Sequence, residues 1–402
     1  MIQKYKQSLD EFMIQVPTQI FFGKTALNEL ANGIREFGDR VMILYGGGSI
    51  KRNGLYDKVI KILDDNGIFH CELGGVQPNP RVSLIERAIE IARENRVQVV
   101  LPIGGGSVID SAKGVAGGYF YEGNFTDLLG QNITHDRVLP VITILTLPAS
   151  GTEMATGCTL VNDHVEPHIK MGFHGPYIRP RISYENPEFT YSLSKHQTAA
   201  GVMDVMSHIF ESYFSNEKRA YLQARTAEGM LRTLIKYAPI AFEEPDNYEA
   251  RANLMYCSSW GNNGIIVKGN FVSWSVHPLE NPINERYNTT HGDGLAVLTP
   301  VWMRWAKRPE NLYRYVELGV NVFDIDKNLP DEQIAEMAID KVEDFIQNTL
   351  GLPKNLRSMG VKEEDFEKMA EVFTQPAKIE YQSEAFVPIS KHDAIEIYKR
   401  AY

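Results

Sequence analysis

Residues 97–113 read VQVVLPIGGGSVIDSAK, and this stretch decides the fold. Its first part, residues 97–103, is a run of β-branched and other apolar side chains, which is typical of a buried strand. Three glycines and Ser107 follow, and after them the pattern becomes helical. A strand, a glycine turn and a helix in this order are typical of one unit of a parallel sheet with helices on both faces.

The same order occurs more than once in the first half of the chain. Residues 40–45 (RVMILY) and 139–147 (LPVITILTL) also have the pattern of strands, while residues 55–65 and 85–94 have that of helices. After about Ser192 the β signal fades, and long helical patterns take over at residues 197–214, 220–238 and 331–350. We therefore predict an α/β dinucleotide-binding domain with a Rossmann-like parallel sheet over residues 1–190. An all-helical domain is expected over residues 191–402.

The composition limits the classes of protein to consider. The chain has 402 residues, 43% of them hydrophobic and 23% charged, as in folded globular proteins of more than one core. A net charge of -10 argues against nucleic acid or a membrane as partner. Residues 1–15 lack the pattern of a signal peptide, and Cys71, Cys158 and Cys257 form no C-x-x-C pair. We expect a cytoplasmic protein with reduced thiols.

Two glycine-rich turns are candidates for binding a nucleotide. Residues 46–49 and 104–107 both read GGGS and both lie between a predicted strand and a helix. A turn without Cβ atoms lets a pyrophosphate approach the backbone N–H groups at a helix start. Neither turn completes G-x-G-x-x-G, and either alone is explained as a tight turn. Together they favour nucleotide binding.

The residues after the first glycine turn bear on the choice of nucleotide. Lys51 and Arg52 stand where many dinucleotide-binding proteins have an acid for the ribose. Cations here favour a 2′-phosphate, hence NADP(H) over NAD(H). Solvated surface charges are the alternative interpretation.

Four residues of the second half could hold a metal ion. Asp204 and His208 are four apart in a helical pattern, so their side chains share one helix face about 6 Å apart. His277 and His291 follow in WSVHP and HGDG. Taken singly, each is better explained as an ion pair or a structural hydrogen bond. One carboxylate and three imidazoles without a thiolate suit Fe(II), Zn(II) or a similar ion, and are poor ligands for Ca or Mg.

A second group of histidines competes with this one. His164, His168 and His174 lie within eleven residues, but Pro167 interrupts any helix there. We interpret them as loop residues. Glu211, three residues after His208, could be a further ligand or could orient a ligand histidine.

These motifs, in this order, resemble those of the iron-containing (group III) alcohol dehydrogenases, and most closely their butanol dehydrogenase and aldehyde reductase branch. The resemblance covers essentially the whole chain. It rests on GGGSIKRNG from Gly46, QPNP from Gln77, GGGSVIDSAK from Gly104, LTLPASGTEM from Leu145, GVMDVMSHIFE from Gly201, DNYEARANLMY from Asp246 and HGDGLAVLTP from His291.

The resemblance implies the site residues one by one. It implies the dehydroquinate synthase-like architecture, with the active site in a cleft between an α/β and an all-helical domain. The implied metal ligands, through which catalysis would act, are Asp204, His208, His277 and His291. The implied cofactor-binding residues, with Lys51 added from the charge argument above, are Gly47, Gly48, Ser49, Lys51, Asn79, Gly105, Gly106, Ser107, Asp110, Thr146, Leu147, Ser150, Thr152 and Lys170.

The chain departs from the pattern of these relatives at two main places. Relatives commonly carry H-x-x-x-H where this chain has His277-Pro-Leu-Glu-Asn281. Asn281 cannot titrate, so a proton must come from water or a ribose hydroxyl chain. The continuation PINER, residues 282–286, also differs from the usual small apolar stretch. A lesser change places Asn186 where relatives usually have Asp.

The predicted activity is a metal-dependent hydride transfer between NAD(P)H and a small aldehyde or primary alcohol. The alternative is a lyase of the dehydroquinate synthase kind, which needs a cationic cluster for a phosphorylated substrate. Between residues 264 and 288 only Lys268 and Arg286 are available. A sensor that binds without turnover has no feature in its favour. Relatives are usually dimers or larger, so a homo-oligomer is expected.

Overall fold

The computed structural model describes residues 9–166, 168–272, 274–374 and 385–402. Residues 1–8 of the segment considered for a signal peptide, and Pro167, lie outside these ranges. The chain divides into two compact units. One is Val16–Leu193, and the other is Ser194–Tyr402 with the segment that precedes Val16.

The Val16–Leu193 unit is built on a parallel sheet. Among the described residues six strands pair in the order β1-β8-β5-β4-β2-β3, and each neighbouring pair is parallel. The strands are β1 (Gln19–Phe22), β2 (Arg40–Tyr45), β3 (Phe69–Leu73), β4 (Val99–Gly105), β5 (Ile142–Leu147) and β8 (Ile182–Glu185). The helices are α1 (Leu30–Arg35), α2 (Ser49–Arg52), α3 (Leu55–Asp65), α4 (Val82–Glu94) and α5 (Gly106–Gly118).

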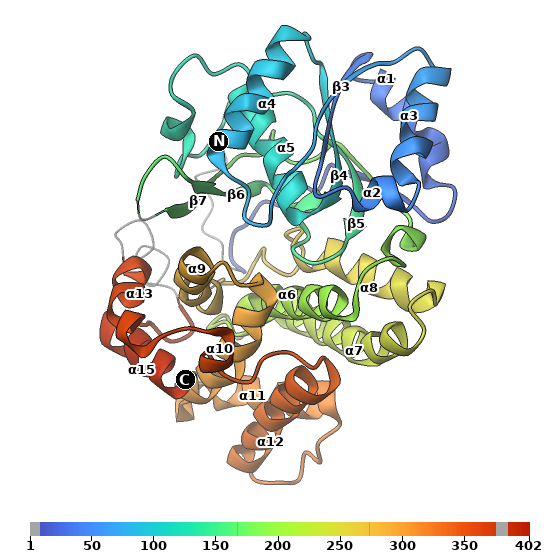
Figure 1. Ribbon diagram of the computed structural model, residues 1–402. Helices are drawn as coiled ribbons and strands as arrows, with labels where there is room; N and C mark the ends of the chain where they lie inside the picture. The colour runs from blue at the N-terminus through green and yellow to red at the C-terminus, as the bar shows by residue number, and fades with distance from the viewer. Residues whose placement is uncertain (1–8, 167, 273, 375–384) are drawn as a thin grey trace. The chain divides into compact units, whose positions relative to one another are not determined.

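Helices cover both faces of this sheet, as the sequence predicted. Side chains alternate along a strand, so Val41 and Ile43 of β2 pack with α1 and α3, while Met42 and Leu44 pack with α4 and α5. Figure 1 shows α4 and α5 together, and α1 and α3 on the other side of the strands. The strand at residues 40–45 and the helix at residues 55–65 are confirmed with the same bounds.

An antiparallel hairpin stands apart from the sheet. It consists of β6 (Gly157–Asn162) and β7 (Ile169–His174). His164 lies in the turn, and His168 directly precedes β7. His174 is the last residue of β7, so its interpretation as a loop residue was wrong. The strand forms because residues 169–174 pair along their whole length with β6.

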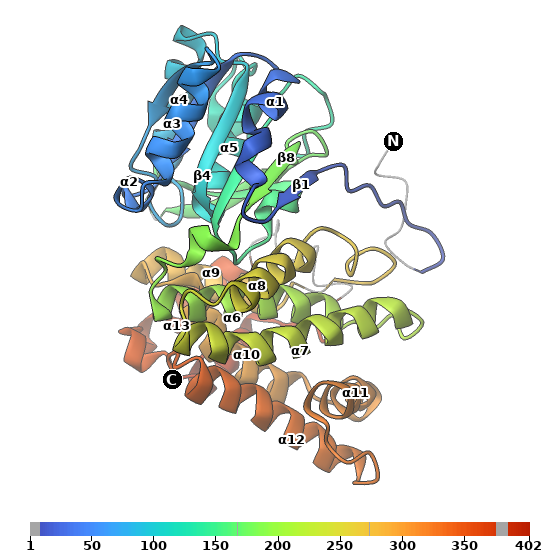
Figure 2. The ribbon, with the colours of Figure 1, turned by 90° about the vertical axis from the view of Figure 1, so that its right-hand side faces the viewer.

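The Ser194–Tyr402 unit is helical. Figure 2 shows α6 and α7 running side by side. Its helices are α6 (Lys195–Tyr213), α7 (Tyr221–Glu243), α8 (Tyr248–Gly261), α9 (Val276–Tyr287), α10 (His291–Ala306), α11 (Leu312–Phe323), α12 (Asp331–Asp344), α13 (Phe366–Phe373) and α15 (Lys391–Arg400). The helical pattern at residues 331–350 continues from α12 into a π-turn, Phe345–Thr349.

The core of the helical unit is aromatic where α6 and α10 meet α11. Phe214 packs against Trp302, Tyr315 and Phe386, with ring centroids 5.0–5.4 Å apart. Such contacts bury large apolar areas and fix the relative orientation of the helices. Among the described residues no helix is both long and apolar enough to cross a membrane.

Candidate metal and nucleotide sites

Helix α6 presents Asp204 and His208 on one face. The helix starts at a capping box in which Ser194 and Gln197 bond each other's backbone N–H groups, and this fixes its first turn. Asp204 and His208 are both largely buried, and the His208 Nδ1 lies 3.1 Å from Asp204 Oδ1. The same nitrogen lies 2.8 Å from the main-chain oxygen of Asp204. The predicted spacing therefore brings the two side chains into direct contact.

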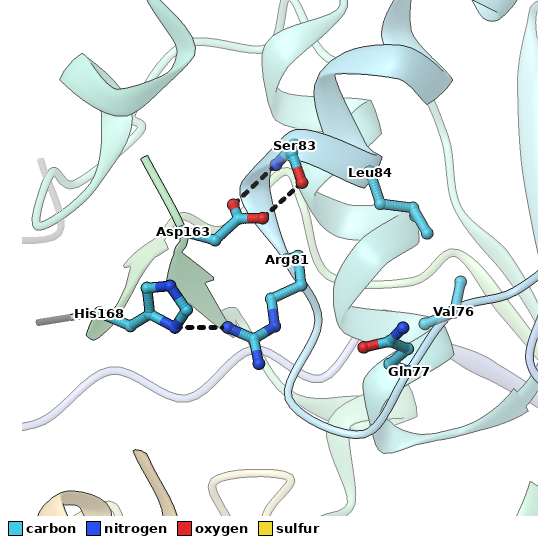
Figure 3. A pocket seen from close by; sticks show the side chains of 7 residues that line it. All are labelled: Val76, Gln77, Arg81, Ser83, Leu84, Asp163 and His168. Atoms are coloured by element: carbon cyan, nitrogen blue, oxygen red, sulfur yellow. Dashed lines mark hydrogen bonds between the residues drawn. The ribbon is translucent and has the colours of Figure 1, made fainter. Parts of the chain in front are cut away.

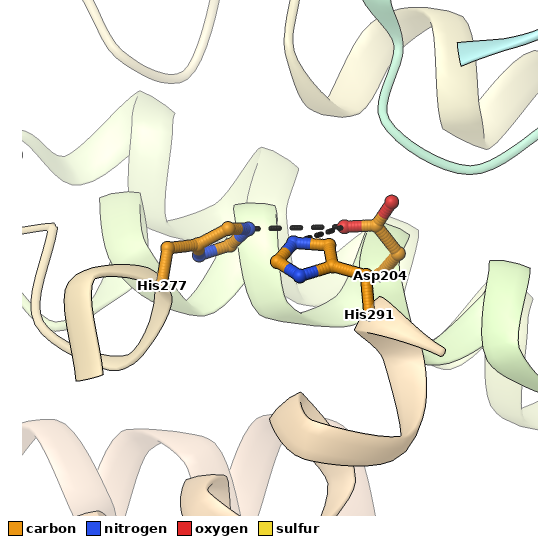
Figure 4. Close-up of side chains that lie close together, drawn as sticks. All are labelled: Asp204, His277 and His291. Carbon is orange, nitrogen blue, oxygen red and sulfur yellow. Dashed lines mark ion pairs between the residues drawn. The ribbon is translucent and has the colours of Figure 1, made fainter. Parts of the chain in front are cut away.

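Two further histidines converge on the Asp204 carboxylate. His277 is the second residue of α9, and His291 is the first residue of α10. Their Nε2 atoms lie 3.7 Å and 3.9 Å from Asp204 Oδ1. One ligand atom from each of the three residues falls within 4.8 Å of the others (Figure 4).

His208 lies beside this group. Its ring centroid is 4.5 Å from that of His277, but its Nδ1 faces Asp204. The role of His208 as a ligand stays a prediction.

Two buried carboxylates contact the Nδ1 atoms of His277 and His291. Glu211 Oε1 lies 3.1 Å from His277 Nδ1, and Glu211 also accepts backbone N–H groups at the start of α9. Glu280 Oε2 contacts His291 Nδ1. A carboxylate on Nδ1 fixes the tautomer that leaves Nε2 free for a metal. The sequence predicts such a role, as one of two alternatives, for Glu211 but not for Glu280.

The electrostatics of this group favour a positive charge. Burial opposes ionisation of Asp204 and Glu211, yet the histidines that they contact lower the pKa of both carboxyls. Burial likewise opposes the charged form of His277, but Asp204 and Glu211 raise its pKa to about 9. The two carboxylates thus stabilise a cation between them, and a divalent ion provides that charge as well as a proton does.

The donor atoms left over fit a metal ion. Asp204 Oδ1 lies within ion-pair distance of His208 Nδ1, but neither this oxygen nor His277 Nε2 has a hydrogen-bond partner of good geometry among the described residues, and both atoms are buried. Buried polar atoms normally have partners, so two that point at the same place indicate a missing ligand. One carboxylate oxygen and imidazole nitrogens are donors that Fe(II) and Zn(II) accept. The residues present therefore fit the predicted ion.

In the α/β unit, the second glycine turn packs against the residues that follow β5. A Cβ on Gly105 would lie 2.9 Å from Leu147 Cβ, and one on Gly106 would lie 2.7 Å from Ser150 Oγ. Glycine is required for this close approach. The structure thus brings the turn at residues 104–107 together with residues 147–152. Helix α5 begins at Gly106, where its free N–H groups can meet an anion.

Asp110 and Thr152 are tied to a lysine that the sequence reasoning missed. Thr152 Oγ1 donates to Asp110 Oδ1 at 2.5 Å, and the Asp110 Oδ2 accepts from the N–H of Thr159. Lys113, fully buried on α5, donates to Thr152 Oγ1 at 2.6 Å. The sequence does carry a signal for Lys113, which is a lysine three residues after Asp110 in a helix of mostly small and apolar residues. Lys170 on β7 is near enough for its charge to act on Asp110.

Of the two cations that follow the first glycine turn, Lys51 is engaged by neighbouring side chains, whereas Arg52 is not paired with an acid among the described residues. Gly48 has φ +87°, which glycine adopts without strain, and Gly47 has open space around its Cα. Lys51 Nζ lies 3.4 Å from Glu72 Oε1 and over the ring of Tyr56. Arg52 has no ion pair among the described residues, and its guanidinium lies beside Gly48.

The two residues before Gln77 join this turn, and Gln77 borders a small cavity. The N–H groups of Gly75 and Val76 donate to the carbonyls of Gly46 and Tyr45. Asn79, further on, has φ +58°, an uncommon conformation that often marks functional positions. The cavity has a volume of about 400 Å³ and is shown in Figure 3. It is lined by Val76, Gln77, Arg81, Ser83, Leu84, Asp163 and His168.

The rival histidines do not come together as a metal site. His164 pairs with Glu86, and His168 Nδ1 lies 2.8 Å from Arg81. Within the described ranges, the group formed by Asp204, His277 and His291 is the one with metal-ligand spacing.

The chain is similar to known proteins along most of its length. Residues 17–187 match the family of iron-containing alcohol dehydrogenases, and residues 198–402 match the C-terminal region of the Fe-containing alcohol dehydrogenase family. The chain is 49% identical to NADH-dependent butanol dehydrogenase B of Clostridium acetobutylicum, over 90% of this chain and 92% of that protein. It is 33% identical to an NADPH-dependent aldehyde reductase of Escherichia coli, over 88% of this chain and 90% of that one.

A solved structure shows the same fold along the whole chain. NADH-dependent butanol dehydrogenase A from Thermotoga maritima superimposes with a TM-score of 0.90 and 32% sequence identity, over 98% of this chain and 100% of that chain. The chain belongs to the iron-containing alcohol dehydrogenase family. It is an oxidoreductase of alcohols and aldehydes that uses a pyridine nucleotide.

Proposed function

We propose that this chain interconverts small aldehydes and primary alcohols, as a butanol dehydrogenase does, with a metal ion held by Asp204, His208, His277 and His291. The observation that supports the metal centre best is the convergence of Asp204 Oδ1 with the Nε2 atoms of two histidines in a buried site. A divalent ion there supplies Lewis acidity toward a substrate oxygen. Fe(II) and Zn(II) both suit the donors.

The protein side chains have distinct tasks in this proposal. Glu211 and Glu280 orient two imidazoles. In the α/β unit, the two glycine turns and the residues 146–152 would hold the nucleotide, with Asn79, Asp110 and Lys170. Asn281 lies one turn after His277 on α9, and therefore on the same helix face. Its amide can hydrogen-bond a substrate oxygen but cannot transfer a proton, so we assign the proton to water or a ribose hydroxyl.

For the nucleotide we propose NADP(H) as the favoured form, with NAD(H) also accepted. Arg52 supports the 2′-phosphate, because its guanidinium lies beside the first glycine turn. Lys51 supports it less, since Glu72 and two tyrosine rings already engage its ammonium group. The relatives include four proteins named for NADH, one named for NADPH and one named for NADP.

The experiment is an aldehyde reductase assay on the full chain. We expect butanal to oxidise NADPH and NADH, with loss of activity on chelation and recovery when Fe(II) or Zn(II) is added. His277→Ala should abolish activity because it removes a ligand, whereas His164→Ala, in the rival group, should leave it unchanged. Full turnover by the metal-free protein would contradict the metal centre.

The same assay separates the lyase alternative. A dehydroquinate synthase-like lyase regenerates its NAD, so it would give no net change in nicotinamide absorbance. The structure also weakens this alternative, because Arg286, one of its two candidate cations, is paired with Asp365.

Assembly and location remain proposals that rest on the resemblance. We propose a homodimer or larger homo-oligomer in the cytoplasm that acts on small molecules. Light scattering on the purified protein measures the assembly directly.

A further inference from the structure

We propose that Glu280 is a positioning residue of the metal centre. It holds the ring of His291 so that Nε2 faces Asp204, and it thereby sets the affinity of the site for the ion. The inference rests on the proposed function, since it concerns the same ion. It concerns a residue that neither the sequence motifs nor the chemistry of the donor set identifies.

Among the described residues, His291 is the hydrogen-bond partner of the Glu280 side chain. The side chain is fully buried on α9, and its Oε2 contacts His291 Nδ1. Its Oε1 is buried and has no hydrogen-bond partner among the described residues. A carboxylate is costly to bury unless it is paired. Its placement against a single imidazole therefore indicates a role at that imidazole.

Helix α10 carries a glycine where the carboxylate packs. A Cβ on Gly294 would lie 2.5 Å from Glu280 Cγ and 2.9 Å from Oε1. Any other residue at position 294 would push the carboxylate away from His291. The second glycine of the HGDG motif is thus explained by room for Glu280, an observation independent of the hydrogen bond itself.

Glu280 differs from the other groups that hold the ligand histidines. Glu211 also accepts the backbone N–H groups of Ser275, Val276 and His277, so its loss would disturb the start of α9. The Nδ1 of His208 faces a main-chain oxygen, which no substitution removes. Unlike Glu211, Glu280 accepts from no backbone N–H group among the described residues, so its substitution removes no backbone hydrogen bond from α9 or α10. It is therefore the residue at which the role of such a group can be measured.

The expected size of the effect follows from known metal sites. A carboxylate on the far nitrogen of a ligand histidine fixes the tautomer and makes the ring a stronger donor. Its loss typically weakens metal binding by about 10–100-fold. Glu280→Gln keeps the shape and removes the charge, so we expect a loss of roughly 10-fold. Glu280→Ala also leaves the His291 ring free to rotate, so we expect metal binding to weaken by roughly 100-fold.

The test measures Zn²⁺ affinity by competition with a chelator in the full-length protein, and the visible spectrum of the Co²⁺-loaded form. Glu280→Gln should weaken Zn²⁺ binding and shift the Co²⁺ bands, while the unfolding temperature of the metal-free protein stays at the wild-type value. Gly294→Ala, which displaces the carboxylate without removing it, should weaken Zn²⁺ binding in the same way.

The matched control is Glu228→Gln on α7, which is also buried and bonds Tyr213 and Arg225. It should lower the unfolding temperature and leave Zn²⁺ affinity unchanged. Wild-type affinity and an unshifted Co²⁺ spectrum in Glu280→Gln would overturn the inference, as would an equal loss of affinity in Glu228→Gln. A wild-type protein that binds no Zn²⁺, Co²⁺ or Fe(II) would instead overturn the proposed metal centre.

Discussion

At the scale of single residues, the histidines of the metal group are defined by their partners. The Nδ1 atoms of His277 and His291 each face a buried carboxylate, and that of His208 faces a main-chain oxygen. Each ring therefore keeps Nε2 for another ligand. The histidines could be proposed from the sequence because a family pattern contains them. Glu280 could not, because it acts on a residue eleven positions away on another helix.

Lys113 shows how a residue without contact to the proposed ligands can maintain a site. Its ammonium donates to Thr152 Oγ1 and to the carbonyls of Ala155 and Gly157, at 2.6–3.0 Å. These three acceptors use all of its protons. Burial lowers its pKa to about 8, although Asp110 opposes this shift. The ammonium therefore remains charged near neutral pH and joins α5 to the residues after β5.

We predict that Lys113→Met destabilises the protein by about 3–5 kcal/mol, because it leaves three buried acceptors without a donor and removes a positive charge that acts on the buried Asp110. Urea unfolding monitored by circular dichroism measures this change. Lys58→Met, at an exposed position on α3, should stay within about 0.5 kcal/mol of wild type. A loss below about 1 kcal/mol for Lys113→Met would show that the network contributes little.

At the scale of elements, the sequence predicted those with a long and regular pattern. The strand of residues 40–45 is buried almost throughout, and α3 has one clear apolar face, so both were placed correctly. The strands β1 and β3 lie at the edges of the sheet, and most of their positions are exposed or half-buried. Their short segments carry no clean alternation. β8 is buried but only four residues long.

The hairpin of β6 and β7 was also missed, for a different reason. Its strands are held by each other, through pairing from Gly157 with His174 to Asn162 with Ile169. Such pairing depends on partners, which a single segment does not reveal. A glycine makes the approach of the two strands possible. A Cβ on Gly172 would lie 1.6 Å from the carbonyl oxygen of Cys158.

We predict that Gly172→Ala destabilises the α/β unit by at least about 1–3 kcal/mol, since the overlap is with backbone and no side-chain rotation relieves it. Gly229→Ala is the opposite case. Gly229 is exposed within α7 and has open space for a Cβ, so alanine should stabilise by about 0.5–1 kcal/mol. Thermal unfolding of both variants measures these two changes in stability. An equal effect of the two substitutions would contradict the packing argument.

At the scale of the whole molecule, the two proposed sites lie in different units. All four proposed metal ligands belong to the Ser194–Tyr402 unit, and all proposed nucleotide-binding residues belong to Val16–Leu193. The two halves of the sequence could be distinguished by their periodicity, whereas the assignment of the sites rested on the glycine turns, the spacing of Asp204 and His208, and the family resemblance. The ligand geometry could not be derived in the same way, because α6, α9 and α10 meet only through tertiary packing.

The buried tyrosines of the helical unit give the molecule a defined response to alkali. Burial raises the pKa of Tyr213, Tyr315 and Tyr398 well above the ordinary value. Each phenol donates its proton, to Glu228 Oε1, the Met303 carbonyl and the Leu279 carbonyl respectively. The folded chain therefore keeps these protons at a pH where the unfolded chain has lost them.

We predict that the free energy of unfolding falls as pH rises above about 10, the pKa of an unfolded tyrosine. Each group contributes up to about 1.4 kcal/mol per pH unit, and all of this stability is present below pH about 10. Lys113 acts in the opposite direction, because its pKa in the folded chain lies below its pKa in the unfolded chain. Lys113 and Asp110 both lie in the other unit. Urea unfolding from pH about 8 to about 11 measures the slope. Tyr315→Phe should remove the contribution of one tyrosine from the slope of the free energy of unfolding against pH. An unchanged slope would show that Tyr315 keeps its ordinary pKa when folded.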